Sequence, residues 1–367
     1  MIEIHKREEN NNSSDENYHL NNNNQNNKDS SVGDNSIKYS NIDEMNEFFR
    51  KTSPKFHEKF ELIDFIGQEH QNFIYEGRDK NNVKRKLIFE LYTQNNNLSK
   101  YNDKYIKKKL HHMNISQIYA FYRIDATYCF SITESYKYGN LRNFTSKFLK
   151  RRTLSEMLVN FITKPILEGL NYLHKKKILH MNIQKDNIVI TNDINIKIIN
   201  FSESISLKDY EPDEIIRFPN ITIRRYMSPE LMNKTQIQAK YGEKIDVYSL
   251  GVTLYNLLFG RYPYRLSRVR EDDFDKMIEQ LNNTTLEFPK DIDISELCLN
   301  FLRKILEKDY KKRYSIKDAL DDKWVKGWDI INSEKENTGN LENFIIRLVN
   351  DNVPRFNKYI NEEYFLD

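Results

Sequence analysis

The stretch from His180 to Phe201, HMNIQKDNIVITNDINIKIINF, constrains the fold of this chain more than any other. An apolar pair, Ile178 and Leu179, leads into a polar turn, and β-branched runs follow at residues 188–190 and 196–199 with a polar break between them. Short β-branched runs bounded by polar residues are typical of strands. The sequence therefore predicts two short strands beside a turn that is rich in side-chain amides.

The rest of the chain divides into a strand-rich part and a helical part. Short aromatic and β-branched segments, typical of strands, occur at residues 60–66, 73–77, 86–92, 115–123 and 128–134, with a helical candidate at residues 105–111. Between Leu158 and Leu173, apolar side chains recur every three or four residues, which places them on one face of a long helix. Further helices are predicted at residues 248–259, 297–306 and 316–320.

Size and composition allow a large core but favour no charge-driven function. With 367 residues, of which 38% are hydrophobic, the chain can bury a core in two lobes or domains. Its 57 basic and 54 acidic residues leave a net charge of +3, so no global field favours nucleic acid or an acidic membrane as the partner. We expect partners among other proteins, and the sequence leaves the oligomeric state open.

The cysteines and the N-terminus indicate an intracellular setting. Cys129 and Cys298 lie in apolar runs without metal-like spacing, which predicts reduced thiols. The N-terminus has no apolar signal segment, and no run approaches the ~18 apolar residues of a membrane span. Ile2 excludes the usual myristoylation motif. We therefore expect a soluble cytoplasmic or nuclear protein with no membrane span.

The two ends of the chain differ from its middle. Residues 1–45 are rich in Asn, Ser, Asp and Glu, and such a composition buries too little apolar surface to offset its ordering entropy. We predict a disordered, Asn-rich tail. Residues 327–367 form a C-terminal extension with an amphipathic stripe between Leu341 and Leu348, which predicts a helix. We favour packing on its own domain, with a partner-binding helix as the alternative.

Four ordered motifs within residues 60–326 resemble the eukaryotic protein kinase family, and most of all its serine/threonine branch. YLHKKKILHMNIQKDNIVI is similar to the catalytic loop YLH…HRDLKPENIL, and INFS stands where the family has the metal-binding DFG. YMSPEL is similar to the APE segment, while KIDVYSLGVTLYNLLFGRYPY and LEKDYKKRYSIKDALDDKWV are similar to the parts that follow it.

This resemblance implies an α+β, bilobal protein-kinase-like fold. The kinase-like domain is expected at residues 46–326, with a small antiparallel-sheet N-lobe and one helix at about 60–134 and a larger, mainly helical C-lobe at about 139–326. It also implies structural roles for five residues. Asp246 is expected to accept bonds from the catalytic-loop backbone, Glu230 to pair with Arg313 in a buried ion pair, and His180 to pack beneath the loop, while Phe201 is expected to be structural.

At the positions that carry the chemistry of the family, this chain has amides. The base position of the catalytic loop is Asn182, and the lysine of that loop is replaced by Gln184. The metal positions are Asn187, which is retained, and Asn200, which replaces the DFG aspartate. An amide oxygen brings no formal charge to Mg²⁺, so this site is expected to be weak or non-functional. Met181 replaces the arginine that would bind a phosphorylated activation segment.

The strand-rich lobe departs from the family pattern as well. The glycine-rich loop keeps its first glycine, Gly67, and counting along the third strand places Phe89 at the position of the ATP-binding lysine and Leu87 beneath adenine. Lys86 is the alternative for that lysine, and Asp103 is the nearest match to its partner carboxylate. The residues expected beside a nucleotide are Ile66, Gly67, Ile74, Leu87, Phe89, Thr133, Glu134, Tyr136, Val189 and Ile199.

These substitutions favour a pseudokinase, a protein-binding or allosteric scaffold module with little or no phosphoryl transfer. The alternative is an atypical active serine/threonine protein kinase that transfers the γ-phosphate of ATP to protein hydroxyls. The pseudokinase hypothesis predicts no required cofactor, or ATP bound weakly and independently of Mg²⁺. Its ATP pocket is expected to be degenerate and filled by apolar side chains.

Overall fold

The computed structural model describes residues 40–69, 72–93, 110–123, 128–136, 139–148, 153–191, 195–201, 203–218, 225–270 and 273–327. Most of the predicted N-terminal tail, the helical candidate at residues 105–111 as far as residue 109, Asp103 and the C-terminal extension from residue 328 lie outside these ranges. Their predicted structures stay predictions.

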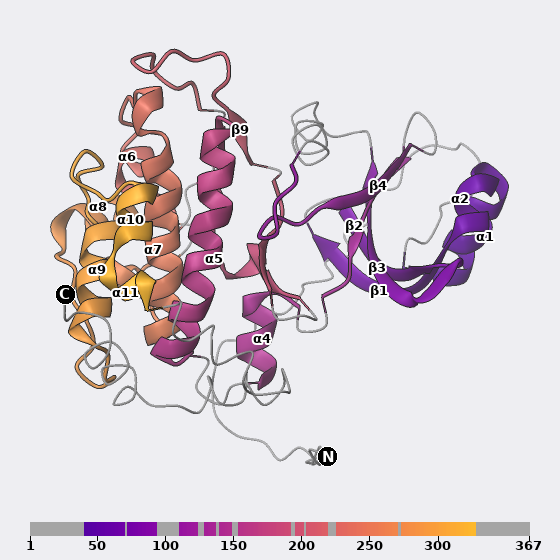
Figure 1. Ribbon diagram of the computed structural model, residues 1–367, viewed down its shortest axis with the longest axis horizontal. Coiled ribbons are helices and arrows are strands. Elements are labelled where there is room, and N and C mark those ends of the chain that lie inside the picture. The colour runs from indigo at the N-terminus through magenta and orange to yellow at the C-terminus, as the bar shows by residue number, and fades with distance from the viewer. Residues whose placement is uncertain are drawn as a thin grey trace. The chain divides into compact units, whose positions relative to one another are not determined.

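A five-stranded antiparallel sheet forms the first part of the fold (Figure 1). Its strands lie in the order β1-β2-β3-β5-β4, so consecutive strands are paired except where β5 lies between β3 and β4. The strands are β1 (Phe60–Glu69), β2 (Asn72–Asp79), β3 (Asn82–Thr93), β4 (Ile118–Arg123) and β5 (Tyr128–Glu134). The five predicted strands are confirmed, with longer β1 and β3 than their apolar runs suggested.

Two helices cover one face of this sheet, and the sequence did not suggest either. In Figure 1, α1 (Ile42–Thr52) and α2 (Pro54–Lys59) lie together against the sheet. Phe49 and Phe56 are buried, with ring centroids 5.1 and 5.3 Å from that of Phe130 in β5. The tail boundary predicted near residue 45 therefore lies inside α1, because four apolar side chains among its eleven residues are enough to dock it on the aromatic face of the sheet.

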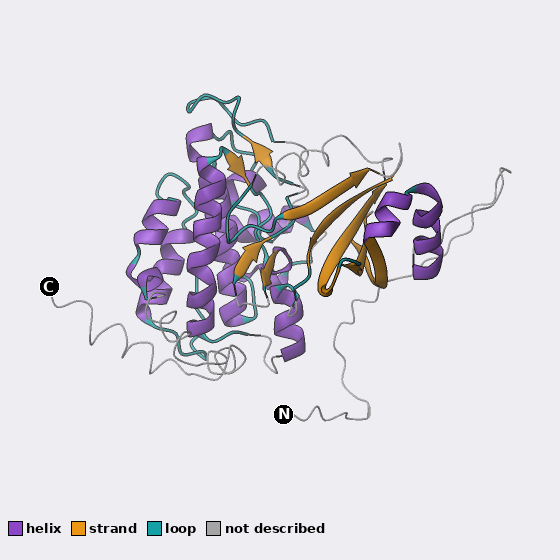
Figure 2. Ribbon diagram, turned by 45° about the vertical axis from the view of Figure 1, so that its right-hand side comes forward, coloured by secondary structure: helices purple, strands orange, loops and turns teal. Residues whose placement is uncertain are grey.

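The helical part is built around α5 (Glu156–Lys175) and α7 (Glu243–Phe259), which pack side by side (Figures 1 and 2). The predicted apolar stripe of α5 is buried, and α7 is buried along nearly its whole length. Further α-helices of this part are α4 (Leu141–Phe148), α6 (Pro229–Met232), α8 (Phe274–Asn283), α9 (Glu296–Ile305), α10 (Ile316–Asp321) and α11 (Lys323–Lys326). Within the described ranges, no helix is long and apolar enough to cross a membrane.

In the part of the chain that the structure describes, two small ladders and three 3₁₀ turns accompany these helices. Strand β6 (Ile178–Leu179) pairs with β9 (Ile205–Ser206), and β7 (Ile188–Ile190) pairs with β8 (Ile196–Ile198). The 3₁₀ turns are η1 (Lys185–Asn187), η2 (Ala239–Tyr241) and η3 (Pro263–Arg268). The two strands predicted beside the polar turn are therefore β7 and β8, and η1 is the end of that turn.

A buried carboxylate ties three helices of this part together. Glu156, at the start of α5, accepts hydrogen bonds from the Ser295 backbone N at 2.8 Å and from Trp324 Nε1 at 2.8 Å. Ser295 is the N-cap of α9 and Trp324 lies in α11. Burial raises the pKa of Glu156, since it disfavours the charged form, while these bonds act in the opposite direction.

We expect Phe56→Ala to lower the free energy of unfolding by about 3–5 kcal/mol, because it empties a fully buried aromatic site between α2 and the sheet. Phe274→Ala is the matched control, since Phe274 is 38% exposed and should cost less than about 1 kcal/mol. Urea unfolding followed by fluorescence measures both. Equal losses would mean that α1 and α2 lie outside the cooperative unit.

Candidate active site

The carboxylate of Asp246 in α7 holds the backbone of the polar turn. It accepts hydrogen bonds from the backbone N of His180 at 2.9 Å and of Met181 at 2.8 Å. A third bond, 2.8 Å long, joins it to Nε2 of His174 at the end of α5. Asp246 is completely buried, so these donors replace the water that an ionised carboxylate needs. The path of the turn therefore depends on a helix more than 60 residues away in sequence.

Asp246 stays ionised in this site. Burial opposes ionisation, but the hydrogen bond and charge of His174, helped by the backbone bond from His180, hold the pKa of Asp246 below its ordinary value. The bond to the Met181 backbone also supports a left-handed conformation there, with φ of 68°. A non-glycine residue in that region costs about 1–3 kcal/mol, and surrounding contacts must hold it in place.

His180 and Phe201 connect the turn to the end of β8. His180 Nε2 bonds to the carbonyl oxygen of Ile199 at 3.0 Å, and its Nδ1 accepts from the Asn182 backbone N at 3.3 Å. Its ring lies edge-on to Phe201, 5.0 Å between centroids. Both rings are fully buried, so they position the turn and are not available to a substrate.

The amide side chains of the turn form one connected network. Gln184 Nε2 donates to Asn182 Oδ1 at 2.8 Å, and Asn187 Nδ2 donates to the Asn182 carbonyl oxygen at 2.8 Å. Asn200 Nδ2 donates to Asn187 Oδ1 at 3.1 Å. The Asn182 amide in turn donates to Glu203 Oε1 at 3.3 Å. Each predicted catalytic or metal position is thus bonded to another, and the carboxylate of Glu203 contacts this network at Asn182.

A Mg²⁺ ion, which the resemblance implies, does not fit these donors. Mg²⁺ is held in proteins by carboxylates together with phosphates and water. Here Asn187 and Asn200 are both neutral, and the oxygen of Asn187 already accepts from the Asn200 amide. Across the described residues, no group of three or more His, Cys, Asp or Glu side chains is arranged to hold a metal.

One carboxylate of the turn pairs with a residue of α4, a contact that the sequence did not suggest. Asp186 in η1 forms a bidentate ion pair with Arg142 of α4, with Nη2 to Oδ2 at 2.8 Å. The hydrogen bonds to Asp186 raise the pKa of Arg142 above its ordinary value. This ion pair links α4 to the turn, and the positive charge of Arg142 neutralises the negative charge of Asp186.

The register of the sheet corrects two predicted nucleotide neighbours. Residues directly opposite each other in an antiparallel pair share a face. Phe89 lies opposite Tyr75 and Leu87 opposite Gly77, whereas Ile74 lies opposite Glu90. Leu87 and Phe89 therefore lie on the face opposite to that of Ile74, and the prediction that all three line one pocket is wrong.

The aromatic cluster beneath α1 and α2 explains where Phe89 goes. Its ring is fully buried, with centroids 6.0 Å from Phe56 and 5.5 Å from Phe60. Gly77 makes the room, because a Cβ there would lie 2.6 Å from Phe89 Cε2. Counting along the strand missed this because a one-residue error exchanges the two faces. Leu87 and Phe89 are core residues and do not fill the nucleotide site.

The face of the sheet that carries Ile74 also carries Thr133 and two residues that were missed, whereas Glu134 lies opposite Leu87 on the other face. Ile66 is 54% exposed, and Gly67 lies opposite Ile74. Thr133 lies opposite Ile88 in the neighbouring strand. Side chains of one strand alternate, so Ile88 and Glu90 share this face. The pairing of β3 with β2 identifies Ile88 and Glu90, whereas counting along the chain from Ile74 indicated Leu87 and Phe89.

The connection after β5 is tied to the helical part by side chains. Glu134 forms an ion pair with Lys197 of β8. Tyr136 shares a 2.6 Å hydrogen bond with Ser116, and burial raises the pKa of the Tyr136 hydroxyl well above its ordinary value. Val189 in β7 is buried opposite Lys197. Ile199 is partly buried at the end of β8, and its backbone N bonds to the Asn187 carbonyl oxygen at 3.0 Å.

Lys86, the alternative for the ATP-binding lysine, lies on the same face as Glu90 but four residues nearer the hairpin turn. It is opposite Arg78, its side chain is 69% exposed, and its Nζ is 2.5 Å from Glu76 Oε1. The charge of Lys86 is thus paired with that of Glu76, close to the turn between β2 and β3.

A cluster of apolar side chains holds the segment that follows β9. In the family, an arginine of the catalytic loop that binds a phosphate has this role. The backbone N of Ile216 bonds to the Ile237 carbonyl oxygen at 2.8 Å, and both side chains are buried. Met181 packs against this cluster, which consists of Leu179, Leu207, Ile216, Ile237 and Ile245. The position where the family has a phosphate-binding arginine is therefore apolar, in contact with the segment that such a phosphate would order.

Glu230 and Arg313 form a buried, bidentate ion pair. Arg313 Nη1 and Nη2 donate to the two carboxylate oxygens at 2.7 and 2.9 Å. Arg313 also donates to the carbonyl oxygens of Lys244 and Glu307, each at 2.7 Å, and stacks on the Tyr248 ring. These hydrogen bonds offset the cost of removing both charges from water, which a buried ion pair requires in order to be retained.

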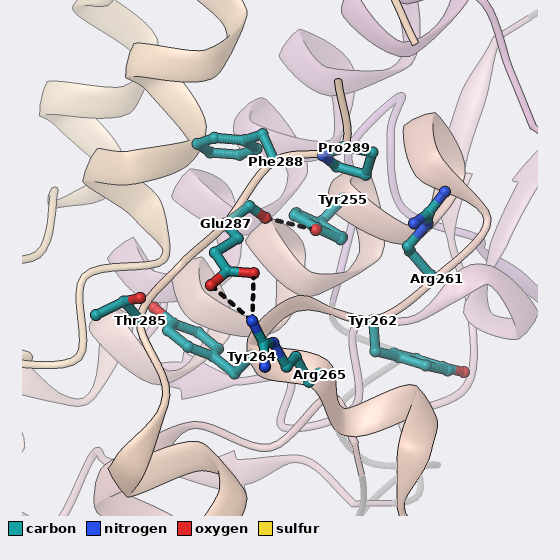
Figure 3. A pocket seen from close by; sticks show the side chains of 9 residues that line it. All are labelled: Tyr255, Arg261, Tyr262, Tyr264, Arg265, Thr285, Glu287, Phe288 and Pro289. Atoms are coloured by element: carbon teal, nitrogen blue, oxygen red, sulfur yellow. Dashed lines mark hydrogen bonds and ion pairs between the residues drawn. The ribbon is translucent and has the colours of Figure 1, made fainter. Parts of the chain in front are cut away.

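A cavity of about 210 Å³ lies in the helical part and contains none of the predicted site residues (Figure 3). It is bordered by the ion pair of Arg265 with Glu287, and the Tyr255 hydroxyl donates to the Glu287 carbonyl oxygen at 2.7 Å. Figure 3 shows the other lining residues, Arg261, Tyr262, Tyr264, Thr285, Phe288 and Pro289.

Comparison with known proteins agrees with this geometry. The family model described as "Protein kinase domain" matches residues 34–325, which is most of the chain. The chain belongs to the protein kinase domain family. The predicted α+β, bilobal fold, with an antiparallel-sheet lobe and a helical lobe, is confirmed. The matched range includes α1 and α2.

The similar proteins are named as protein kinases. Calcium-dependent protein kinase 4 of Plasmodium falciparum is 28% identical over 322 residues, covering 82% of this chain and 56% of that protein. Its namesake in Plasmodium berghei is 30% identical over 223 residues, covering 60% and 39%. Death-associated protein kinase 2 of Mus musculus is 29% identical over 248 residues, covering 65% and 62%. The chain thus spans little more than half of the first of these relatives and less of the second.

We expect Asp246→Asn to lower the free energy of unfolding by about 3–5 kcal/mol near neutral pH, because it removes one partner from a buried charged network. The folded-state pKa of Asp246 lies below its unfolded value of about 3.9, so its stabilisation is present above that pH and is lost as the pH falls through the folded pKa. The difference between variant and wild type should therefore shrink in acid.

Urea unfolding from pH 7 down to pH 3 measures this effect. Asp275→Asn is the control, because Asp275 is exposed in α8. A loss that is the same at every pH would contradict the assignment of the charged carboxylate as the anchor.

Proposed function

We propose that this kinase domain is a pseudokinase, acting as a protein-binding or allosteric scaffold module with little or no phosphoryl transfer. The observation that supports the proposal is the connected amide network, in which hydrogen bonds link Gln184 to Asn182, Asn182 to Asn187, and Asn187 to Asn200. In an active kinase the corresponding groups accept a proton, neutralise a phosphate and hold the metal.

The chemistry supports this proposal at each position. A general base contributes about 10²–10⁴-fold to a rate, and the Asn182 amide is not basic at physiological pH. Metal-assisted charge neutralisation needs a carboxylate where Asn200 stands. Opposite Glu76 and Ile74, β3 presents Ile88 and Glu90, while Lys86 on the same face is paired with Glu76 near the hairpin turn. Because groups that act as a unit lose their effect together, one surviving member does not rescue the rate.

The proposal includes a ligand, a partner and a location. We propose that ATP binds weakly or not at all and without dependence on Mg²⁺, and that the partners are other proteins. An intracellular setting is supported by the free thiol of Cys298, which is fully buried. The predicted domain limits, 46–326 with a lobe division near residues 134–139 and an extension from residue 327, are part of the same proposal.

A phosphotransfer assay with labelled ATP, Mg²⁺ and a mixture of protein acceptors tests the proposal. We expect no transfer above background, and we expect the double variant Asn182→Asp/Asn200→Asp to remain inefficient, because Gln184 and Glu90 persist. An active relative serves as the positive control, and thermal unfolding verifies that the double variant is folded. Robust transfer by wild type would refute the pseudokinase proposal, and robust transfer by the double variant alone would refute the prediction that two restored carboxylates do not suffice.

The second candidate function is that of an atypical serine/threonine protein kinase. The names of the similar proteins favour it, since each of those reported above is a protein kinase. One feature of the site favours it too: Glu203 Oε1 lies 3.3 Å from the Asn182 amide, so a carboxylate contacts the base position. In this hypothesis Glu203 accepts the hydroxyl proton that Asn182 does not accept.

If transfer is detected, we expect Glu203→Gln to reduce it by about 10²-fold or more, the typical loss of a general base. Glu211→Gln, an exposed change in the same segment, is the control and should leave the rate unchanged. Initial rates at saturating ATP measure both. If Glu203→Gln transferred phosphate as fast as wild type, Glu203 would not be the general base, and this observation would no longer favour the second candidate function.

A further inference from the structure

Residues 205–218, which we call the strap, are paired with the rest of the helical part at two places. At the start of the strap, β9 pairs with β6, and the backbone N of Leu207 donates to the Lys177 carbonyl oxygen at 2.6 Å. Near its end, the backbone N of Ile216 donates to the Ile237 carbonyl oxygen at 2.8 Å. The strap is therefore attached both beside the polar turn and beside the loop that precedes α7.

The second attachment is longer than one hydrogen bond. Ile215 pairs with Gln238 in an antiparallel bridge, and the backbone N of Ala239 donates to the Glu214 carbonyl oxygen at 2.8 Å. These bonds involve main-chain groups alone. The path of the strap therefore does not depend on the chemical state of its side chains at this place.

Apolar side chains fill the space beneath the strap. Leu207 and Ile216 are buried in one cluster with Leu179 and Ile237. The start of α7 lies directly against this cluster: a Cβ on Gly242 would lie 3.0 Å from Leu179 Cδ1, 3.1 Å from Leu207 Cδ1 and 3.2 Å from Ile216 Cδ1. The cluster is thus as closely packed as a protein core.

The charge contact of this region is exposed and contributes less than the cluster. Lys240 forms an ion pair with Asp213, whose side chain is 74% exposed. Water and salt screen such a pair, so it adds little stability. Burial of Leu207 and Ile216 removes apolar surface from water, and salt does not weaken that effect. We therefore expect the attachment to persist at high ionic strength.

Apolar contacts also connect the strap to the polar turn. A phosphorylated side chain orders a segment of this kind by bonding to arginines. Here Met181 stands at the position of the phosphate-binding arginine and packs against the cluster, while its backbone N is held by Asp246. The strap thus contacts the turn through apolar side chains rather than through a charge pair.

We propose that the strap is a permanently seated activation segment, held by backbone pairing and apolar burial, whose conformation phosphorylation does not switch. The proposal goes beyond the proposed function and does not depend on it, because none of these contacts involves the amide positions, a nucleotide or a metal. With either candidate function, the polar turn keeps one neighbour in one place.

Hydrogen exchange of the full chain tests the proposal, with protein produced in bacteria and shown by mass spectrometry to carry no phosphate. We expect the amides of Leu207, Ile216 and Ala239 to exchange at least about 100-fold more slowly than in an unstructured chain. This protection should persist in about 1 M NaCl, where the Debye length is about 3 Å. Exchange at the unstructured rate in the phosphate-free protein, or protection that is lost at high salt, would overturn the proposal without any variant.

Ile216→Ala and Ile215→Ala are a matched pair of variants. Ile216 is buried in the cluster, whereas its neighbour Ile215 is 38% exposed. We expect Ile216→Ala to speed exchange of the strap amides by about tenfold or more, because it leaves a cavity in the seat, and Ile215→Ala to change it by less than about twofold. Thermal unfolding verifies that both variants are folded. Equal effects of the two substitutions would contradict the role of the apolar seat.

The two proposals fail in different ways. Phosphotransfer in the labelled-ATP assay refutes the pseudokinase proposal and leaves the strap seated. Rapid exchange of the strap amides, measured without ATP, acceptor or metal, refutes only the seated strap.

Discussion

The charged hydrogen bonds of Asp246 are the constraint on which the candidate site depends. One carboxylate, buried in α7, accepts from His174 and from the backbone of His180 and Met181, and it thereby fixes the start of a strained turn. Such a carboxylate cannot be removed without leaving several buried donors unsatisfied. This anchoring is independent of whether the turn carries out a reaction, because none of these groups has to touch a substrate.

The same separation between framework and chemistry extends through the molecule. The Glu230–Arg313 pair, the His180–Phe201 contact and the buried helices α5 and α7 maintain the kinase fold. On this framework the reactive positions carry amides that satisfy one another. The two faces of the sheet show the same separation between residues that maintain the fold and residues at reactive positions. Helices α1 and α2 complete a core on one of them, while the other, which bears Ile74, presents Ile88 and Glu90.

Much of the fold and part of the site could be predicted from the sequence. The strands, the long helix and the order of four motifs were sufficient for the bilobal fold, because alternation and helical periodicity are local properties. The amide positions were equally accessible, since Asn182, Asn187 and Asn200 are separated by short spacings that need no gap. The docking of residues 42–59 was not, because a short amphipathic segment beside a polar tail gains its stability only from the surface that it covers.

The sequence by itself determined which residue types replace the catalytic groups of a kinase, and tertiary structure alone decided which of them meet. It moved Phe89 and Leu87 into the core and placed Glu90 opposite Ile74, because side chains of a strand alternate and register is set by pairing with the neighbouring strand. It also brought Glu203 to Asn182, a contact across 21 residues that no spacing rule specifies. Both facts concern charge in the cleft, and charge acts through space rather than along the chain.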